Sequence, residues 1–547
     1  NILDTSFLAL GNEAVSFARP FTISPSGTGS LADAAWYTTN GATPEFDPDT
    51  GYRVLLGRFF VDQGATLGGA FGGPNADTQS RVYVGWMDDI GIRIGVFDVP
   101  VTVTCAPVLR VDVGARPDGD GLEWASAFND LQAALQTATT CGGAVSEIWV
   151  AAGSYIPAEP LGDRTISFDL RDGVAVYGGF PPGGGKFDER DPIEYETILS
   201  GDLNADDNAG GDNSENSYHV LSAIGILDGV TTILDGFIIT AGNAGGVDDP
   251  QDDDAGGLLL DGSSLTVVNC VFAGNTAFAG GAMSLLNSSF LQLINCKLIA
   301  NTAANGGGLA QSTASFVEMV NCLVVDNQAA DHSGAINSAE STLHLINCTV
   351  SNNDAPQADA IRIDGETSVA TIANCVLWGN GDGVQDDQIM LAQGALPTNL
   401  NVDYSCVQGW TGEYRGIGNI DADPLFVDPN AADYHMLSDS HCIDAADNIA
   451  VPERVTTDLD GNPRFVDVRC TDDTGNGTAP VVDMGVFEFQ VTCPWDLDCN
   501  GSVGASDLLT LLASWGPCKG CLADFDGNGA VGASDLLALL ANWGPCP

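Results

Sequence analysis

Two short acidic loops near the end of the chain have the residue types and spacing to hold cations. In each twelve-residue loop, Asp, Asp and Asn stand at positions 1, 3 and 5, Gly at position 6 and Asp at position 12. Alternating oxygen donors surround a cation, the glycine makes the sharp turn, and the last carboxylate closes the shell. Position 7 would add a backbone carbonyl. The expected ligands are Asp496, Asp498, Asn500, Ser502 and Asp507, and then Asp524, Asp526, Asn528, Ala530 and Asp535. The pattern predicts two calcium ions.

Each loop leads into a leucine-rich segment, DLLTLLASWGP at 507–517 and DLLALLANWGP at 535–545. The leucines follow helical spacing, and a glycine followed by proline ends each helix. Two loop–helix units in tandem resemble a type I dockerin, an EF-hand-like module that docks onto cohesin domains. The resemblance implies that the residues before the last Asp of each loop recognise the partner, and that the repeat has two equivalent faces. These residues are Ala505, Ser506, Ala533 and Ser534.

The module departs from the dockerin pattern in two ways. Position 9 is Gly504 or Gly532 in place of the usual Asn, so water could supply that ligand. Four cysteines also bracket the repeats with the same 28-residue symmetry, and Cys499 has no counterpart. Two disulfide patterns respect that symmetry: Cys493–Cys518 with Cys521–Cys546, or Cys493–Cys546 with Cys518–Cys521.

A weaker cation signal lies in DLNADDN at 202–208, where Asp202, Asn204 and Asp206 alternate. The loop lacks the glycine that would follow in a calcium loop. Both a calcium-stabilised insertion and a solvated acidic loop fit this pattern.

The middle of the chain repeats with a fixed period. Five cysteines, 26, 26, 26 and 27 residues apart, sit in equivalent positions: Cys270, Cys296, Cys322, Cys348 and Cys375. Apolar and polar residues alternate on both sides of each cysteine, as in β-strands. The alternation slips by one residue at the Asn before each cysteine, which indicates a bend, because Asn tolerates the left-handed backbone conformation. A second Asn follows five residues after each cysteine and closes the strand.

This period predicts a parallel β-helix with one coil per repeat. The cysteines are expected to face inward and to stack as small buried fillers. A metal site and disulfides between coils are the alternatives, but no histidine recurs with the cysteines. Asp458 and Asp460 are expected to hold down a terminal segment, with Arg464 as an internal partner.

Short pieces of the repeat, Phe272-Ala-Gly-Asn275 and Gly280-Gly-Ala282, resemble those of the polymorphic outer-membrane-protein class of right-handed β-helices. Segments upstream, such as EIWVAAGSYIPAE at 147–159, look like the N-terminal cap of that class, and 423–489 resembles the terminal segment of many secreted bacterial β-helices. The likeness covers roughly residues 120 to 490. It implies a right-handed β-helix and export.

The fold expected is mainly β, a right-handed parallel β-helix with a β-sandwich before it and a small α-helical module after it. A β-sandwich is expected because residues 1–104 contain short alternating runs with Gly and Asp turns. The expected domains are 1–104 (β-sandwich), 105–220 (cap and first coils), 221–420 (repeats), 421–492 (C-terminal cap) and 493–547 (dockerin-like module). An amphipathic helix is expected over 124–138.

Composition limits the partners. Eighteen basic against 73 acidic residues give a net charge of −55, which repels nucleic acid and anionic membranes. No apolar run is long enough to span a bilayer. The first residue is Asn, as in a processed chain, and 15 cysteines favour a secreted or cell-surface protein.

Catalytic residues are not evident. Between residues 221 and 400 only Lys297 and Arg362 are basic, and a lyase of this fold needs a basic residue near calcium. Carboxylates that could serve a hydrolase, Asp326, Glu340 and Asp364, fall at different positions in their coils. We therefore expect no catalytic residue and no enzyme.

The function expected from these features is a non-catalytic extracellular structural protein. Its β-helical rod would join other subunits through the calcium-dependent module, with head-to-tail filaments as one form. The partner would be a cohesin-like domain or a second copy of the chain. The alternatives are a polysaccharide-binding or polysaccharide-degrading β-helix protein attached through its dockerin, and an adhesin.

Overall fold

The structure is a computed structural model of residues 1–547. It describes residues 104–546 except 118, 161, 208–212, 228–231, 246–252, 382–387, 469–470, 491–492 and 519, and it also gives the backbone of six strands before residue 104. The chain divides into two compact units, Asn1–Val145 and Ser146–Pro547. No described helix is long and apolar enough to cross a membrane.

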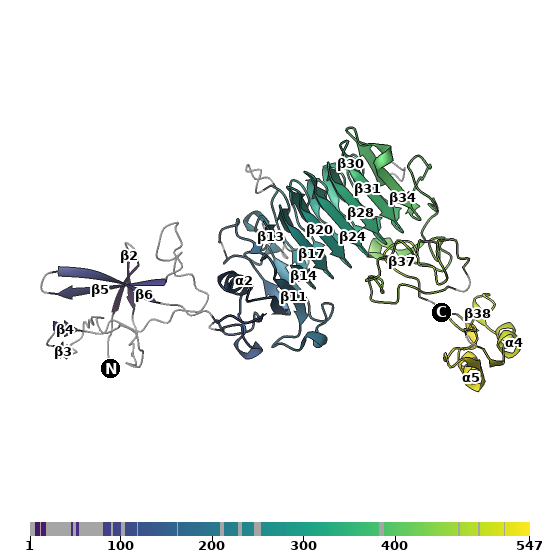
Figure 1. The fold of residues 1–547 in the computed structure, drawn as a ribbon, viewed down its shortest axis with the longest axis horizontal. Helices are drawn as coiled ribbons and strands as arrows, with labels where there is room; N and C mark the ends of the chain where they lie inside the picture. Colours follow the sequence, from purple (N-terminus) through teal and green to yellow (C-terminus); the bar gives the residue numbers. More distant parts are fainter. Residues whose placement is uncertain are drawn as a thin grey trace. The chain divides into compact units, whose positions relative to one another are not determined.

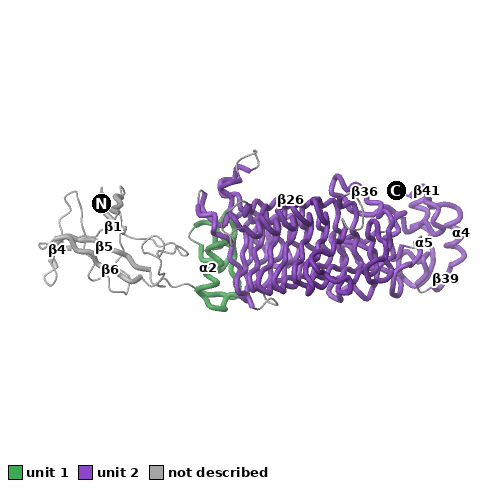
Figure 2. Tube along the Cα trace, turned by 90° about the horizontal axis from the view of Figure 1, so that it is seen from above, with its two compact units in different colours: residues 1–145 green, residues 146–547 purple. Residues whose placement is uncertain are grey.

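The second unit contains a parallel β-helix of about nine coils, built from three long sheets in which strands of successive coils pair in parallel. Figure 1 shows these strands as stacked arrows, and the coils follow one another along the tube in Figure 2. In the first sheet the order is β10 (Phe168–Asp169), β13 (Leu221–Ile224), β16 (Leu258–Asp261), β19 (Met283–Leu286), β23 (Leu309–Gln311), β27 (Ile336–Ala339), β30 (Ile361–Asp364) and β33 (Ile389–Ala392). The predicted parallel β-helix is confirmed.

The second and third sheets follow the same order along the axis. The second contains β8 (Glu147–Ala151), β11 (Ala175–Phe180), β14 (Ile233–Asp235), β17 (Ser264–Val268), β20 (Phe290–Ile294), β24 (Phe316–Val320), β28 (Thr342–Ile346), β31 (Val369–Ala373) and β34 (Leu400–Asp403). The third contains β9 (Gly153–Tyr155), β12 (Thr197–Ser200), β15 (Ile238–Thr240), β18 (Val271–Ala273), β21 (Lys297–Ile299), β25 (Leu323–Val325), β29 (Thr349–Ser351), β32 (Val376–Trp378) and β35 (Cys406–Val407). Two further strands, β22 (Thr302–Asn305) and β26 (Gln328–His332), pair in parallel outside these sheets.

The bends between the second and third sheets fall where the sequence predicts them. We call the five repeated cysteines, Cys270, Cys296, Cys322, Cys348 and Cys375, the ladder cysteines. The Asn before each of them has a positive φ, between 51° and 57°. The five cysteines that follow are unpaired and fully buried, which confirms their expected role as core fillers. Burial raises the pKa of the Cys270 thiol well above its usual range, so this thiol stays neutral.

The second Asn of each repeat does more than close a strand. Asn275, Asn301, Asn327 and Asn353 are at most 1 % exposed and stack in register from coil to coil. Each donates from Nδ2 to the Oδ1 of the next Asn at 3.0 Å, and the row continues to Asn380. We call this row the asparagine ladder. It satisfies buried polar groups at the same turn of the five coils from Asn275 to Asn380.

The described part of the first unit, from residue 104 to 145, is a small folded segment. It contains β7 (Val108–Val111), the short helix η2 (Trp124–Ser126) and α2 (Leu131–Thr140), and a disulfide joins Cys105 to Cys141. The helix predicted over 124–138 begins later, because Asp130 caps α2 by accepting a hydrogen bond from the N–H of Gln132.

Before residue 104 the structure describes three antiparallel hairpins. They pair β1 (Ser6–Leu10) with β2 (Glu13–Phe17), β3 (Glu45–Asp47) with β4 (Gly51–Arg53), and β5 (Ser80–Asp88) with β6 (Gly91–Val99). Most of the predicted β-sandwich lies outside the described residues.

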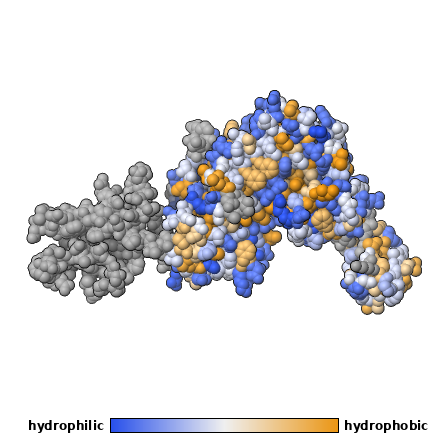
Figure 3. Space-filling view, viewed as in Figure 1, coloured by the Kyte–Doolittle hydropathy of each residue, from blue (hydrophilic) through white to orange (hydrophobic). Residues whose placement is uncertain are grey.

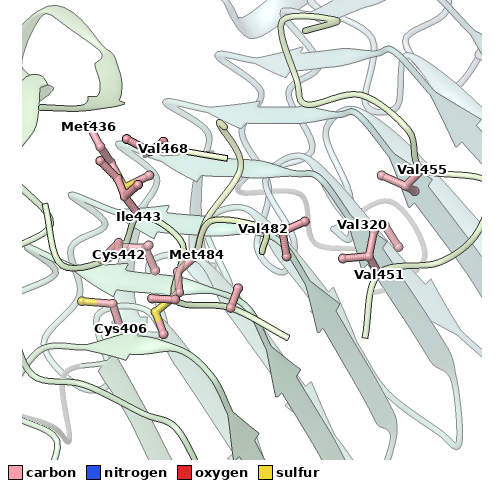
Figure 4. Close-up of a cluster of buried hydrophobic side chains, with 13 residues drawn as sticks. Val320, Cys406, Met436, Cys442, Ile443, Val451, Val455, Val468, Val482 and Met484 are labelled. Atoms are coloured by element: carbon pink, nitrogen blue, oxygen red, sulfur yellow. The ribbon is translucent and has the colours of Figure 1, made fainter. Parts of the chain in front are cut away.

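The segment 421–490 packs back onto the last coils and forms a cap. It contains β36 (Phe426–Asp428), η7 (Pro429–Ala431) and β37 (Asp433–Met436). Its buried side chains, among them Cys442 and Met484, form one cluster with Val320, Val376 and Cys406 of the coils (Figure 4). Short helices elsewhere in this unit are η3 (Phe187–Glu189), η5 (Asn213–Glu215) and η6 (Pro397–Asn399).

Polar side chains are buried inside this cap, among them Asp458 and Arg464, which the sequence analysis expected to hold down a terminal segment. Asp458 and Arg464 are at most 1 % exposed, and Arg464 Nε lies 3.7 Å from Glu488 Oε2. Asp460 instead lies at the surface, where its carboxylate contacts His435 Nε2 at 2.8 Å. Burial, followed by the charge of Asp483, raises the pKa of Glu488 to about 9.

The last 55 residues form a separate two-helix module. Helices α4 (Ala505–Ala513) and α5 (Ala533–Ala541) each follow one acidic loop. Short strands cross over between the repeats: β38 (Ser502–Val503) pairs with β41 (Gly544–Pro545), and β39 (Gly516–Pro517) with β40 (Ala530–Val531). The four cysteines that bracket the repeats pair as Cys493–Cys546 and Cys518–Cys521, the second of the two patterns that the spacing allowed.

Candidate functional site

The first acidic loop brings its carboxylates to one point. Oxygen atoms of Asp496, Asp498 and Asp507 lie within 4.8 Å of one another. Asp507 is fully buried at the start of α4, where it accepts hydrogen bonds from the N–H groups of Leu497 and Gly504, both at 2.7 Å. Backbone donors therefore fix this carboxylate at the point where the expected ligand shell closes.

The second loop repeats this geometry. Asp524, Asp526 and Asp535 also converge within 4.8 Å, and Asp535 accepts from the N–H groups of Phe525 and Gly532 at 2.8 Å. The glycine at position 6 of each loop has a positive φ, 81° at Gly501 and 86° at Gly529, as the sharp turn requires. The two loops therefore present two similar carboxylate clusters, each suited to a hard divalent cation.

The other expected ligands lie beside these clusters. Asn500 Oδ1 accepts from the N–H of Ser502 at 3.1 Å, and Asn528 Oδ1 accepts from the N–H of Ala530 at 3.0 Å. Both amides therefore face their own loop backbone in this structure. Coordination by them, and by the carbonyls of Ser502 and Ala530, remains a prediction.

The residues expected to contact a partner are exposed at the start of each helix. Ala505, Ser506, Ala533 and Ser534 all lie at the surface. Ser534 Oγ donates to Asp526 Oδ2 at 2.6 Å, and hydrogen bonds from the two serines are the main cause that lowers the pKa of Asp498 and of Asp526. These serines thus also support the ionised form of a loop carboxylate.

The module also exposes apolar side chains that the sequence analysis did not single out. Leu509, Leu512 and Trp515 are 66 %, 46 % and 49 % exposed, and their counterparts Leu537, Leu540 and Trp543 are 67 %, 46 % and 49 % exposed. Hydrophobic residues reach the surface of this module in Figure 3. The matched values indicate two equivalent apolar faces, each formed by one helix and the tryptophan after it.

A further acidic cluster lies on the β-helix, at the weaker cation signal. Carboxylate oxygens of Asp202, Asp206, Asp207 and Glu215 lie within 4.8 Å of one another, whereas Asn204 is exposed and is not among the lining residues of the adjacent hollow. Asp207 lies next to the predicted residues in the sequence. Glu215 was not predicted, because η5 brings it back to the loop across residues that carry no periodic pattern. Burial and the charges of Asp206 and Asp207 raise the pKa of Glu215.

This cluster borders a hollow of about 500 Å³ beside strands β12 and β15 of the third sheet. Most of its lining side chains are polar: Ser200, Asp202, Asp207, Asn213, Asn216, Thr240, Asn243 and Thr276. Asn216 is 1 % exposed and donates from Nδ2 to Asp207 Oδ2 at 2.8 Å, while its Oδ1 accepts no hydrogen bond. The hollow offers both donors and acceptors to a polar ligand.

The residues considered for catalysis are not brought together. Arg362 forms an ion pair with Asp364 at 2.9 Å and lies inside the first sheet with 6 % exposure. Asp326 and Glu340 contact Asn352 and Thr367 of their neighbouring coils. No acidic cluster among the described residues contains Asp326, Glu340 or Asp364.

Comparison with known proteins gives few matches. No protein-family model and no curated protein sequence matches the chain. Among solved structures, the pectin methylesterase from Aspergillus niger in deglycosylated form matches with a TM-score of 0.24 and 12 % identity over 59 % of this chain and 88 % of that chain. Its penultimately deglycosylated form matches with a TM-score of 0.24 and 13 % identity over 59 % and 89 %.

These comparisons correct one prediction and leave others untested. Both solved chains are, by their names, enzymes, and this finding contradicts the expectation of a non-catalytic structural protein that builds filaments. At this identity the likeness itself concerns the fold. The resemblances to polymorphic outer-membrane proteins and to dockerins have no matching family model and remain predictions.

Proposed function

We propose that this chain is an extracellular polysaccharide-binding or polysaccharide-degrading β-helix protein that carries calcium and attaches to a protein partner through its C-terminal module. The observation that carries this proposal is the polar hollow beside β12 and β15, with four carboxylates at its edge. Hydroxyl, amide and carboxylate groups are the partners that sugar hydroxyls need.

The ligand class follows from charge. The hollow has two lining carboxylates, and the chain carries a net charge of −55, so an acidic polysaccharide would be repelled. A neutral polysaccharide is not repelled, and its hydroxyl groups can form hydrogen bonds with the Asn and Asp side chains as donors and acceptors. A calcium ion at Asp202, Asp206, Asp207 and Glu215 would relieve the repulsion among them and could also bind sugar hydroxyls.

The disulfides support an extracellular site of action. Cys105–Cys141, Cys493–Cys546 and Cys518–Cys521 need an oxidising compartment to form and persist. The module in which two of them lie would hold one calcium ion in each acidic loop. Its two exposed apolar faces would serve a cohesin-like domain, since they flank the residues that the dockerin resemblance assigns to recognition.

A panel of neutral and acidic polysaccharides tests the main proposal. Binding is measured by affinity electrophoresis with calcium and with chelator, and each mixture is then assayed for new reducing ends and unsaturated ends. We expect at least one neutral polysaccharide to bind, and Asp207→Ala to weaken that binding at least tenfold. Asp331→Ala, which removes an exposed charge from β26, is the matched control. If both variants bound the polysaccharide equally well, the hollow would not be its binding site.

The docking module is tested separately with type I cohesin domains immobilised on a surface. Two equivalent faces predict that Trp515→Ala and Trp543→Ala each retain binding, because the other face remains. The double variant should lose it. Loss in one single variant but not in the other would contradict equivalence of the faces.

A further inference from the structure

The cap contains a buried carboxylate that its surroundings leave without a donor. Asp444 is 0 % exposed, and neither of its carboxylate oxygens accepts a hydrogen bond. Its backbone, in contrast, is tightly held: the N–H donates to Asp483 Oδ1 at 2.7 Å, and the carbonyl accepts from the N–H groups of Thr474 and Gly475. The side chain is therefore placed firmly in a position where its charge has no partner from the protein.

Other buried carboxylates in the same cap are satisfied. Asp458 accepts from the N–H groups of Asp460, Asn462 and Glu488, and Asp483 accepts from those of Asp444 and Phe489. Burial, followed by the charges of Asp483, Asp473 and Asp467, raises the pKa of Asp444 to about 8. Since the cap supplies donors to its other acids, the lack of any at Asp444 means that its charge must be removed by a proton or compensated by a bound cation.

The buried arginine of the cap is also directed at groups other than Asp444. Asp444, Asp458, Asp483 and Glu488 are all at most 2 % exposed. Arg464 is buried beside these acids, and its Nη2 donates to the carbonyls of Asp483 and Gly485. Its Nε lies 3.7 Å from Glu488 Oε2, so the described contacts of Arg464 are directed away from Asp444.

Two more acids meet Asp444 from the surface. Carboxylate oxygens of Asp444, Asp467 and Asp473 lie within 4.8 Å of one another. Asp467 and Asp473 are exposed, so the cluster is closed on the side of Asp444 and open to solvent on the other. Like charges at this spacing repel unless a cation lies between them.

We propose that Asp444, Asp467 and Asp473 bind a divalent cation in the cap, separate from the C-terminal loops and from the hollow. A site with three carboxylates and no nitrogen or sulfur ligand favours a hard cation, and calcium accepts the additional water or carbonyl ligands that such an open site requires. The buried Asp444 anchors the ion, and the exposed acids complete the protein's share of the shell.

The ion would fasten the cap to the end of the β-helix. Asp447, three residues after Asp444, is joined to Asn374 of the coils by two hydrogen bonds, from its N–H to Asn374 Oδ1 at 2.7 Å and from Asn374 Nδ2 to its carbonyl at 2.9 Å. Asp467 and Asp473 belong to the following loop. A cation shared by both segments therefore links that loop to the coil beneath it.

Calcium counting on the full chain tests the site. Wild type, Asp473→Asn and Asp472→Asn are stripped with chelator, equilibrated with calcium alone and assayed for bound metal per chain. Asp472 is exposed and lies outside the cluster, so its substitution controls for the lost charge. We expect Asp473→Asn to bind one equivalent fewer than wild type and Asp472→Asn to match wild type. Equal stoichiometry in all three chains would overturn the proposal.

Asp444→Asn gives a second readout that does not depend on counting. In chelator the neutral amide avoids the repulsion, so the variant should melt at a temperature equal to or above that of wild type. In calcium the order should reverse by several degrees, because only wild type gains the ion. A variant that is at least as stable as wild type in both solutions would show that no calcium ion compensates Asp444, and the proposal would fail. Neither outcome depends on the polysaccharide or on the docking partner.

Discussion

Asn301 and Asn327 are joined side chain to side chain across two coils, with Nδ2 of Asn301 3.0 Å from Oδ1 of Asn327. The same Oδ1 accepts from the N–H of Asn301, while the Nδ2 of Asn327 donates to the carbonyls of Leu298 and Val325 and to Asn353. One amide thus satisfies groups of its own coil and of both neighbouring coils, in a site with no exposure to water.

Removing one rung of the asparagine ladder should therefore be costly. Asn327→Ala removes the acceptor of the buried Asn301 N–H together with several further hydrogen bonds, and each buried group left without a partner costs about 1–3 kcal/mol. We expect urea unfolding to show a loss of about 3 kcal/mol or more. Gln357→Ala, at an exposed position of the next coil, is the control and should change stability by less than about 0.5 kcal/mol. A similar small effect at Asn327 would mean that water replaces the amide.

The two acidic loops should lose calcium independently. Asp535→Asn removes the charge that closes the second loop, so we expect isothermal titration calorimetry to show one ion fewer in the C-terminal module. Asp507→Asn should cause the same loss in the first loop, because both residues are buried and both accept three backbone hydrogen bonds. If either substitution abolished both ions, the loops would bind cooperatively rather than as two separate sites.

Stability in chelator should fall as the pH rises, because Glu488 is held protonated. Burial and the charge of Asp483, partly opposed by Arg464, raise the pKa of Glu488 to about 9, against 4.5 when it is free. Between these values the unfolded chain loses the proton and the folded chain keeps it. The free energy of unfolding should therefore decrease by up to about 1.4 kcal/mol per pH unit from this group.

Urea unfolding between pH 5 and pH 8 checks this slope. Glu488→Gln cannot ionise and should give a shallower dependence than wild type, whereas Glu453→Gln, at the surface, should keep the wild-type slope. Identical slopes in all three chains would show that Glu488 is ionised in the fold and paired with Arg464.

The five ladder thiols should be inert in the native protein. Each is fully buried, and a thiol reagent must reach the sulfur atom before it can react. We expect Cys270, Cys296, Cys322, Cys348 and Cys375 to resist a thiol reagent for hours and to react within minutes in denaturant. Mass spectrometry of labelled peptides identifies which thiol has reacted. Rapid labelling of Cys322, in the middle of the row, would mean that the coils open in the native state.

How much of this could be predicted depends on whether the residues involved repeat. The β-helix, the bends at Asn269 and its equivalents, and the inward cysteines follow from a 26-residue period, since each strand repeats the local pattern of the last. The carboxylates of each C-terminal loop also lie within twelve residues of one another. In these cases local spacing is enough.

The cap sites could not be found in the same way. Asp444 and Asp473 are 29 residues apart in a segment without period, and their meeting depends on how the chain returns over the coils. Glu215 joins Asp202 for a similar reason, through the turn of η5. The asparagine ladder is an intermediate case. Its period was visible in the sequence and predicted residues that close a strand, but the row of hydrogen bonds depends on the burial and direction of the side chains, which the period alone does not give.

The asparagine ladder also bears on how the length of this protein could change in evolution. Each coil of the ladder forms the same side-chain hydrogen bonds with the coil before it and with the coil after it. Duplicating or deleting one coil would therefore recreate the same contact between neighbouring coils. The cap restricts this freedom, because it is hydrogen-bonded to particular residues of the coils, such as Asn321, Thr349 and Asn374. Insertion or deletion of a coil should therefore be tolerated before Asn321 and selected against after it. The length of the β-helix would then vary in steps of one coil, while the contacts between the cap and the last coils stay the same.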